Sequence, residues 1–159
     1  MPQLNDMIDG AAMTIHKHEV ILWPHLWLSL QLLPALTWTV VPFSPQSSQS
    51  IFQEPGVYAF LVRPQTQFLL ETSYLMYVGM TDRPLRRRFR EYIRERDSGR
   101  IRPKLLRILP LYGEHLFFAF ARVPTGHTPG GIEAQLLSAF VPPGNDQINA
   151  HVNRIRKAF

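Results

Sequence analysis

The feature that most limits how this chain can fold is a long stretch without charged side chains near its start. No Asp, Glu, Lys or Arg occurs between Glu19 and Glu54, and Val20–Phe43 is rich in Leu, Trp and Val. Roughly 20 apolar residues suffice to span a bilayer as a helix, so a membrane anchor has to be weighed. Prolines and polar side chains divide this stretch into short apolar pieces, which argues against a continuous span. The interrupting residues are Pro24, His25, Gln31, Pro34 and Pro42.

Residues 1–53 are therefore expected to form an N-terminal extension that packs on the rest of the chain. The apolar pieces predict a helix around Trp27–Leu33 and an extended segment around Leu36–Val41, and Phe43–Ser50 has the composition of a polar linker. The sequence lacks the basic start and the small-residue cleavage site of a secretory signal peptide. We expect a cytoplasmic protein, and a membrane anchor at Val20–Phe43 is the alternative.

A clearer pattern of secondary structure begins at Glu54. A Pro-Gly pair precedes Val57–Val62, a short apolar run of strand composition, and Tyr74–Gly79 is a second such run. Two neighbouring runs of this kind predict an antiparallel hairpin, here with a long polar tip around Pro64–Thr72.

Two helices, a third strand and a last helix are expected after the hairpin. Residues 54–159 are thus predicted to form one small α+β domain, a three-stranded antiparallel sheet flanked by helices in the order β-β-α-α-β-α. The apolar extension precedes this domain. The signals are Asp82 and Pro84 at the start of a helix reaching about Arg96, a helix over Pro103–Ile108, an apolar strand over His115–Val123, and Thr128 capping a helix that Pro142 ends.

Positive charge is concentrated in one part of this domain. The chain has a net charge of +5, whereas Arg83–Arg107 contains eleven Lys or Arg and three acids, a net +8. The remaining residues therefore carry −3. A concentrated basic block favours a polyanionic partner, with nucleic acid first and an anionic membrane surface second. A solvated helix face that keeps the protein soluble would have the same composition.

The chain contains no cysteine, which excludes disulfides and thiolate zinc sites. Any metal must bind through carboxylate, histidine or backbone oxygen. The three histidines of the C-terminal half show no local ligand spacing such as H-E-x-x-H, so no zinc site is expected there. They are His115, His127 and His151.

Short motifs follow one another in order between residues 54 and 149. Gly56-Val57-Tyr58 and Tyr77-Val78-Gly79 lie on the two hairpin strands, and the basic helix reads Leu85-Arg86-Arg87-Arg88-Phe89-Arg90-Glu91-Tyr92. Glu133 lies near the start of the last helix, and Pro142-Pro143-Gly144-Asn145 follows that helix. In their order and on these elements, the motifs resemble the GIY-YIG nuclease family.

The resemblance implies a metal-dependent endonuclease that hydrolyses phosphodiester bonds, with DNA as the expected substrate. Glu133 would hold Mg²⁺ or Mn²⁺, because a hard cation needs an oxygen ligand. Arg88 would stabilise the phosphate with its permanently charged guanidinium, and Tyr58 would activate water. Tyr77, Tyr92 and Asn145 are the other implied site residues.

Three further arginines, spaced by four residues, share one side of the basic helix. Arg86, Arg90 and Arg94 are expected to contact nucleic-acid phosphates or to face water. No small-molecule cofactor is expected.

Several alternatives stay open. Arg87 is the alternative to Arg88 as the essential arginine, because this chain has one more residue between Gly79 and Leu85 than the family pattern. Asn149 is the alternative to Asn145. A non-catalytic nucleic-acid-binding module that keeps the nuclease fold is the alternative function. A membrane-associated basic protein is a third possibility. Within the enzyme class, a restriction-like enzyme, a structure-specific repair nuclease and an antibacterial toxin all fit.

Overall fold

The centre of the protein is a four-stranded antiparallel sheet with the strand order β1-β4-β2-β3. The computed structural model describes residues 15–28, 30, 33–64, 72–145 and 154. The expected α+β class is confirmed, but the expectation of three strands was wrong. The strands are β1 (Thr39–Pro42), β2 (Gly56–Val62), β3 (Tyr74–Thr81) and β4 (Leu116–Arg122).

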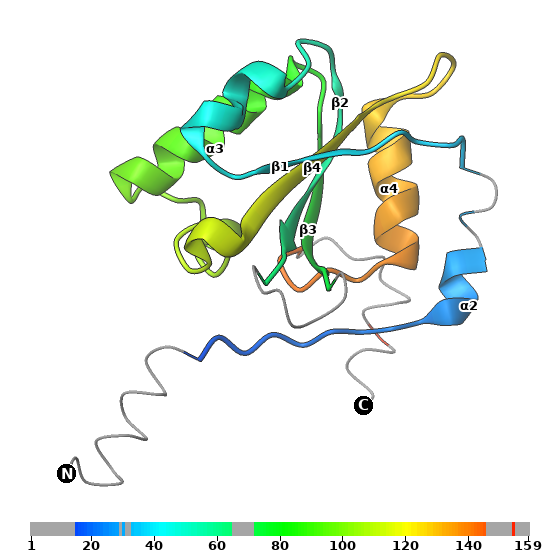
Figure 1. Ribbon diagram of the computed structural model, residues 1–159. Helices are drawn as coiled ribbons and strands as arrows, with labels where there is room; N and C mark the ends of the chain where they lie inside the picture. The colour runs from blue at the N-terminus through cyan, green and yellow to red at the C-terminus, as the bar shows by residue number, and fades with distance from the viewer. Residues whose placement is uncertain (1–14, 29, 31–32, 65–71, 146–153, 155–159) are drawn as a thin grey trace, which may run out of the picture.

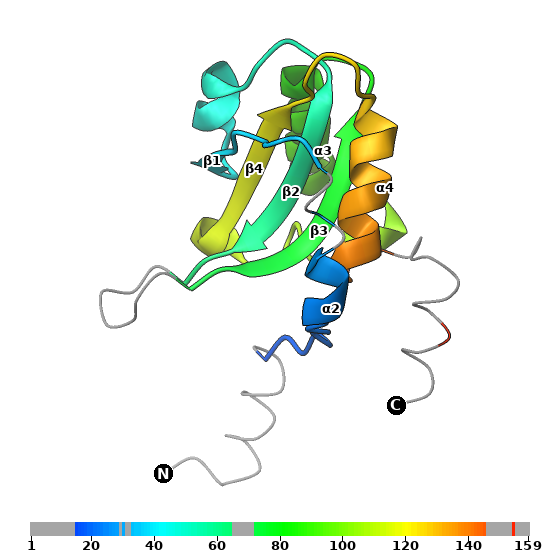
Figure 2. The same cartoon turned by 90° about the vertical axis from the view of Figure 1, so that its right-hand side faces the viewer.

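Helices cover both faces of this sheet, and each face has its own core (Figures 1 and 2). Helix α3 (Leu85–Ser98) packs on a face built from large aromatic side chains, among them Phe60, Phe118 and Phe120. Helix α4 (Pro129–Ala139) packs on the opposite face, where small residues such as Ala59 and Ala119 lie beneath Ile132 and Leu136. The aromatic face is the one that carries the candidate site.

The sequence explains where the two long helices begin and end. The Thr128 hydroxyl accepts a hydrogen bond from the backbone N–H of Gly131 at 3.1 Å, so the expected cap of α4 is confirmed. Helix α3 ends at Gly99, whose φ of +69° is a left-handed conformation that favours glycine. The expected cap by Asp82 was wrong, because α3 begins at Leu85 after Pro84 and has no side-chain cap.

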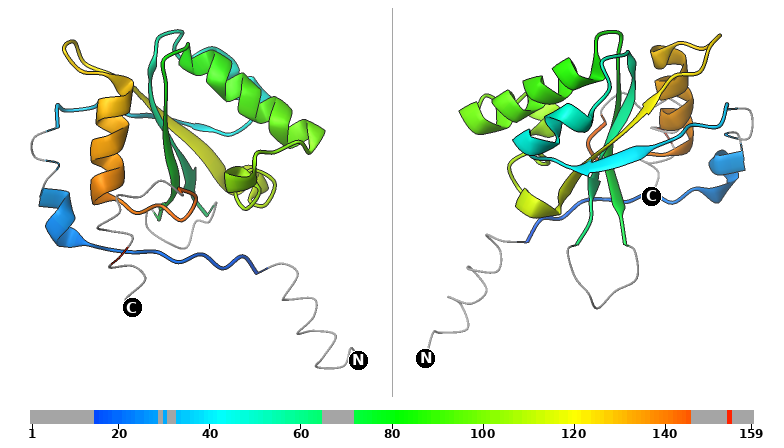
Figure 3. Two further views of the ribbon diagram at one scale, coloured as in Figure 1. Left: turned by 180° about the vertical axis from the view of Figure 1, so that it is seen from behind. Right: turned by 45° about the horizontal axis from the view of Figure 1, so that its top comes forward.

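The N-terminal part contributes to the same packed unit. Strand β1 pairs with β4 from Thr39 to Pro42, so the expected extended segment is an edge strand of the sheet. Helix α2 (Pro24–Trp27) lies against α4 (Figure 3). The Trp27 ring stacks on Phe140 with centroids 6.3 Å apart. The helix expected around Trp27–Leu33 begins three residues earlier in the chain, and part of the expected range lies outside the described residues.

The expected linker over Phe43–Ser50 was also wrong. Residues Pro45–Ser50 form the short 3₁₀ helix η2, which packs against α3. Phe43 and Ile51, at its two ends, are buried in the aromatic core. The described residues just before position 53 thus pack against α3 and the aromatic core.

The remaining differences are local. The expected second helix is only the 3₁₀ turn η3 (Pro103–Leu105), and another 3₁₀ turn, η4 (Gly113–His115), precedes β4. The element order thus differs from the expected one. Most of the hairpin tip, residues 65–71, lies outside the described residues. Among the helices that the structure describes, none combines the length and apolar character needed to cross a bilayer.

Candidate active site

Two tyrosines and an arginine meet at the aromatic face, between β2 and α3. The hydroxyl oxygens of Tyr58 and Tyr92 lie 2.6 Å apart, and both rings are buried. The Nε atom of Arg88 donates to the Tyr58 hydroxyl at 3.4 Å, and the Arg88 guanidinium lies 4.7 Å from the centre of the Tyr92 ring. Residues 88 and 92 share one side of α3, because four residues make about one helical turn. The helix thereby places both over the strand that carries Tyr58.

The glycine of the second hairpin motif makes room for Tyr58. Gly79 is the partner of Tyr58 in the β2–β3 register. A Cβ atom on Gly79 would lie 2.6 Å from the Tyr58 hydroxyl oxygen and 2.6 Å from its Cζ atom. Any other residue at position 79 would push the phenol away from its place. The motif residues Tyr58 and Gly79 are therefore linked by direct packing.

The Tyr58 oxygen can accept hydrogen bonds from two neighbours that keep their protons. Burial raises the pKa of Tyr92, and the neighbouring phenols raise it further, so Tyr92 keeps its proton and can be the donor in its hydrogen bond with Tyr58. Burial works to lower the pKa of Arg88, but Tyr58, Tyr92 and Glu91 together raise it above its usual value. The guanidinium stays charged, and both groups direct N–H or O–H bonds at the Tyr58 oxygen.

Tyr77 connects this cluster to Glu133 on α4. Burial raises the pKa of Tyr77, and electrostatic interactions with Tyr58 and Glu133 raise it further, so this phenol stays neutral. The Lys104 ammonium lies 5.2 Å from the centre of the Tyr77 ring and also interacts with the Glu133 carboxylate. Burial nevertheless raises the pKa of Glu133 overall. The carboxylate, the lysine and the phenol thus share one end of the site.

The outer edge of β3 holds Glu133 and Asn145 in place. Asn145 accepts from the Val78 N–H at 2.9 Å through Oδ1 and donates to the Val78 carbonyl at 2.8 Å through Nδ2. The Met80 N–H donates to the Glu133 carboxylate. β3 is an edge strand, so the N–H and C=O groups on its outer side have no partner among the described strands. The bonds to Asn145 and Glu133 take the place of such a strand. Asn145 therefore fixes β3 through both polar atoms of its amide.

The orientation of the helix separates Arg88 from its rival. The Arg87 side chain is 63% exposed and forms an ion pair with Glu91 at 3.5 Å, whereas the Arg88 side chain is only 17% exposed. Glu91 also accepts from Arg88 Nη1 at 3.0 Å and pairs with Arg83 at 3.1 Å. Arg88 is thus held on two sides, by Glu91 and by Tyr58. Asn149, the rival of Asn145, lies outside the described residues.

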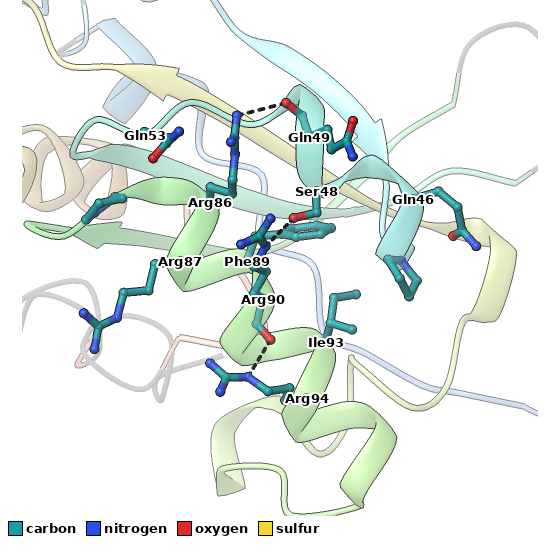
Figure 4. A pocket seen from close by; sticks show the side chains of 12 residues that line it. Gln46, Ser48, Gln49, Gln53, Arg86, Arg87, Phe89, Arg90, Ile93 and Arg94 are labelled. Carbon is teal, nitrogen blue, oxygen red and sulfur yellow. Dashed lines mark hydrogen bonds between the residues drawn. The ribbon is translucent and has the colours of Figure 1, made fainter.

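Two other arginines of α3, Arg86 and Arg90, reach toward η2 (Figure 4). Arg86 donates to the carbonyl oxygens of Ile51 at 2.9 Å and Gln49 at 3.0 Å. Arg90 donates to the Ser48 hydroxyl at 2.7 Å, and Arg94 donates to the Arg90 carbonyl at 3.3 Å. Arg86 and Arg90 therefore attach η2 to α3, a role that the sequence did not indicate.

The donor set suits a hard divalent cation only in part. Within the described part of the chain, no group of three or more His, Cys, Asp or Glu side chains could enclose a metal. Mg²⁺ commonly uses one or two carboxylates and takes its remaining ligands from water and substrate phosphate. Glu133, half-buried beside the phenols, fits this open kind of site.

Sequence reasoning missed two groups that the fold adds to the site. Lys104 comes from η3, and Glu91 lies on α3 among the arginines that it pairs with. Lys104 also borders a pocket of about 290 Å³ with His18, Arg107 and Gly144. No local sequence signal marks Lys104, because its position depends on the turn after α3.

Comparison of the chain with protein-family models, with curated proteins and with solved structures finds no match. Five elements of the fold bring together a charged arginine, three buried phenols, a lysine and a half-buried carboxylate.

Proposed function

We propose that this protein is a metal-dependent endonuclease that hydrolyses phosphodiester bonds in DNA. The observation that carries the proposal is the convergence of Tyr58, Arg88 and Tyr77 with Glu133, from β2, α3, β3 and α4. A phosphodiester cleavage site needs a proton acceptor for water, a cation for the phosphate oxygens and a ligand for a metal. These residues supply one group for each of the three needs.

In this proposal Tyr58 acts as a phenolate: its deprotonated oxygen takes the proton of the attacking water and becomes the neutral phenol, while Tyr92 and Arg88 donate hydrogen bonds to that oxygen. Arg88 binds a non-bridging phosphate oxygen with the N–H groups that Tyr58 and Glu91 leave available, since a guanidinium has five of them. Tyr92 is a positioning residue that holds the Tyr58 hydroxyl. Lys104 offers a second cation for the phosphate, beside Tyr77.

Glu133 would hold the divalent cation through its carboxylate. The cation, when bound, supplies charge neutralisation of the phosphate and help for the leaving alkoxide. Asn145 supports Glu133 indirectly, because it fixes the β3 edge to which the Glu133 carboxylate is also bonded.

The test is to incubate the protein with plasmid DNA, with and without Mg²⁺ or Mn²⁺, and to repeat this with Glu133→Gln and Glu133→Ala. We expect metal-dependent nicking or linearisation by the parent and none by either variant. Glu133→Gln keeps the size of the side chain but removes the charge that a hard cation needs. Its melting temperature and DNA affinity should stay near those of the parent. A Glu133→Gln variant that cuts at the parent rate would remove Glu133 from the proposal.

One observation favours a second candidate, a nucleic-acid-binding module without catalysis. The Tyr58 side chain is 1% exposed, and its hydroxyl already bonds Tyr92 and Arg88. DNA binding in the absence of metal, with no cleavage under any metal condition, would favour this candidate.

A further inference from the structure

A second basic surface lies on the side of α3 that faces away from Tyr58. It is a cleft of about 850 Å³ between η2 and α3 (Figure 4). Buried Phe89 and Ile93 lie at its floor, and the side chains of three glutamines and four arginines surround it. They are Gln46, Gln49, Gln53, Arg86, Arg87, Arg90 and Arg94.

The residues that line this cleft do not compensate its positive charge, and of its arginines only Arg87 has an acidic partner among the described residues, Glu91 at 3.5 Å. None of the described residues that line it is acidic. A smaller pocket farther along α3 shares Arg94 with this cleft but differs in its lining, because it also contains Glu91 and Glu95. Arg86 and Arg90 donate only to neutral oxygens in the η2 segment, so these bonds fix the guanidinium groups without cancelling their charge. A concave surface with charge of one sign raises the local concentration of the opposite charge.

The spacing of the arginines fits a linear polyanion. Arg87 and Arg94 are seven residues apart, which is about two helical turns, so they lie on one side of α3 at a separation of roughly 10 Å. Phosphates of one DNA strand advance by about 3.4 Å each along the duplex axis, so this separation spans about three of them. The glutamine amides at the opposite wall can donate further hydrogen bonds.

We propose that the η2–α3 cleft binds the backbone of the nucleic acid at a distance from the candidate active site. The inference rests on the proposed function for the kind of ligand. Arg87 and Arg94 contact the phosphates, while Arg86 and Arg90 mainly hold η2 as the wall of the cleft. The 3₁₀ helix η2, read from sequence as a linker, thereby becomes part of the substrate-binding surface.

The experiment measures the binding of a short labelled duplex DNA to the full chain in EDTA, over a series from about 50 to 200 mM salt. The double variant Arg87→Ala/Arg94→Ala removes two charges without touching the bonds between η2 and α3. We expect weaker binding and a slope of log affinity against log salt that is smaller by about 1.8, or about 0.9 for each lost phosphate contact. Arg63→Ala/Arg100→Ala removes the same charge outside the cleft and should change the slope by less than half as much.

Equal slopes for the parent and the Arg87/Arg94 variant would overturn the inference, as would an equal loss in the control variant. Binding to vesicles of anionic lipid without binding to DNA would overturn it as well. Because EDTA removes cleavage from the measurement, the two proposals can fail separately. A parent that never cuts but binds through the cleft defeats only the nuclease proposal. A parent that cuts, with binding insensitive to Arg87 and Arg94, defeats only the cleft proposal.

Discussion

The two sides of α3 use the same residue type in different ways. On the side of the candidate active site, Arg88 is half-buried and held between the Glu91 carboxylate and the Tyr58 hydroxyl. On the side toward η2, Arg86 and Arg90 bond only neutral oxygens, and no acidic residue lines the cleft among those described. Arg88 thus has its charge compensated by a carboxylate, whereas the bonds of Arg86 and Arg90 to neutral oxygens leave their charges uncompensated.

This difference matches two separate requirements of a nuclease. Transition-state stabilisation depends on donors held in the right place before the reaction. Affinity for a polyanion depends on the number of unpaired cations that displace its counterions. The comparison therefore predicts that variants on the two sides of α3 change different measurable quantities.

The largest effect should follow from Gly79→Ala, which breaks the active-site side without removing a charge. The new Cβ would collide with the Tyr58 ring and hydroxyl, so Tyr58 would have to leave Arg88 and Tyr92. We expect cleavage to fall to background and the free energy of unfolding to drop by about 1–3 kcal/mol, as in an overpacked core. Plasmid cleavage and urea denaturation would measure the two effects.

The matched control is Gly130→Ala on α4. The nearest atom to its Cβ is the flexible Met80 Cε at 3.4 Å, so the free energy of unfolding should stay the same or rise slightly. If Gly79→Ala also kept parent activity and stability, the described packing of Tyr58 across β3 would be wrong.

A smaller effect is expected from Tyr92→Phe. This change removes the hydroxyl that forms a hydrogen bond with the Tyr58 hydroxyl but keeps the buried ring. One hydrogen bond of this kind contributes about 0.5–1.5 kcal/mol, so kcat should fall by about 3- to 10-fold while KM changes little. A change in KM alone would mean that Tyr92 affects substrate binding and does not position Tyr58.

The sequence predicted the elements whose signals are local. The hairpin strands, the apolar side of α3 and the Thr128 cap of α4 all depend on neighbouring residues, and each was found within a few positions. Strand β1 was expected only as an extended piece, because its pairing with β4 joins residues far apart in sequence. Its Pro42 is tolerated at a sheet edge, where one side of the strand needs no partner.

The polar composition of η2 concealed its packing. Its serines and glutamines read as a linker, yet Ser48 is buried and accepts from Arg90. The same limit applies to the site. Helical spacing predicted that residues 88 and 92 share a side, but it did not predict that Glu91 holds Arg88 or that Lys104 approaches Tyr77. Those contacts depend on tertiary packing, which spacing alone does not specify.

The central claim is that the Arg88 side of α3 performs the chemistry, and Arg87 is the neighbour that tests it. Single-turnover cleavage with saturating enzyme should be measured for Arg88→Ala and Arg87→Ala, together with DNA affinity in EDTA. We predict that Arg88→Ala lowers the rate by about 10²-fold or more, as for a lost transition-state donor, with a smaller change in affinity. Arg87→Ala should mainly weaken binding and should cleave at least about ten times faster than Arg88→Ala. A more damaging Arg87→Ala variant would contradict the account, because it would place the catalytic arginine on the exposed side of the helix.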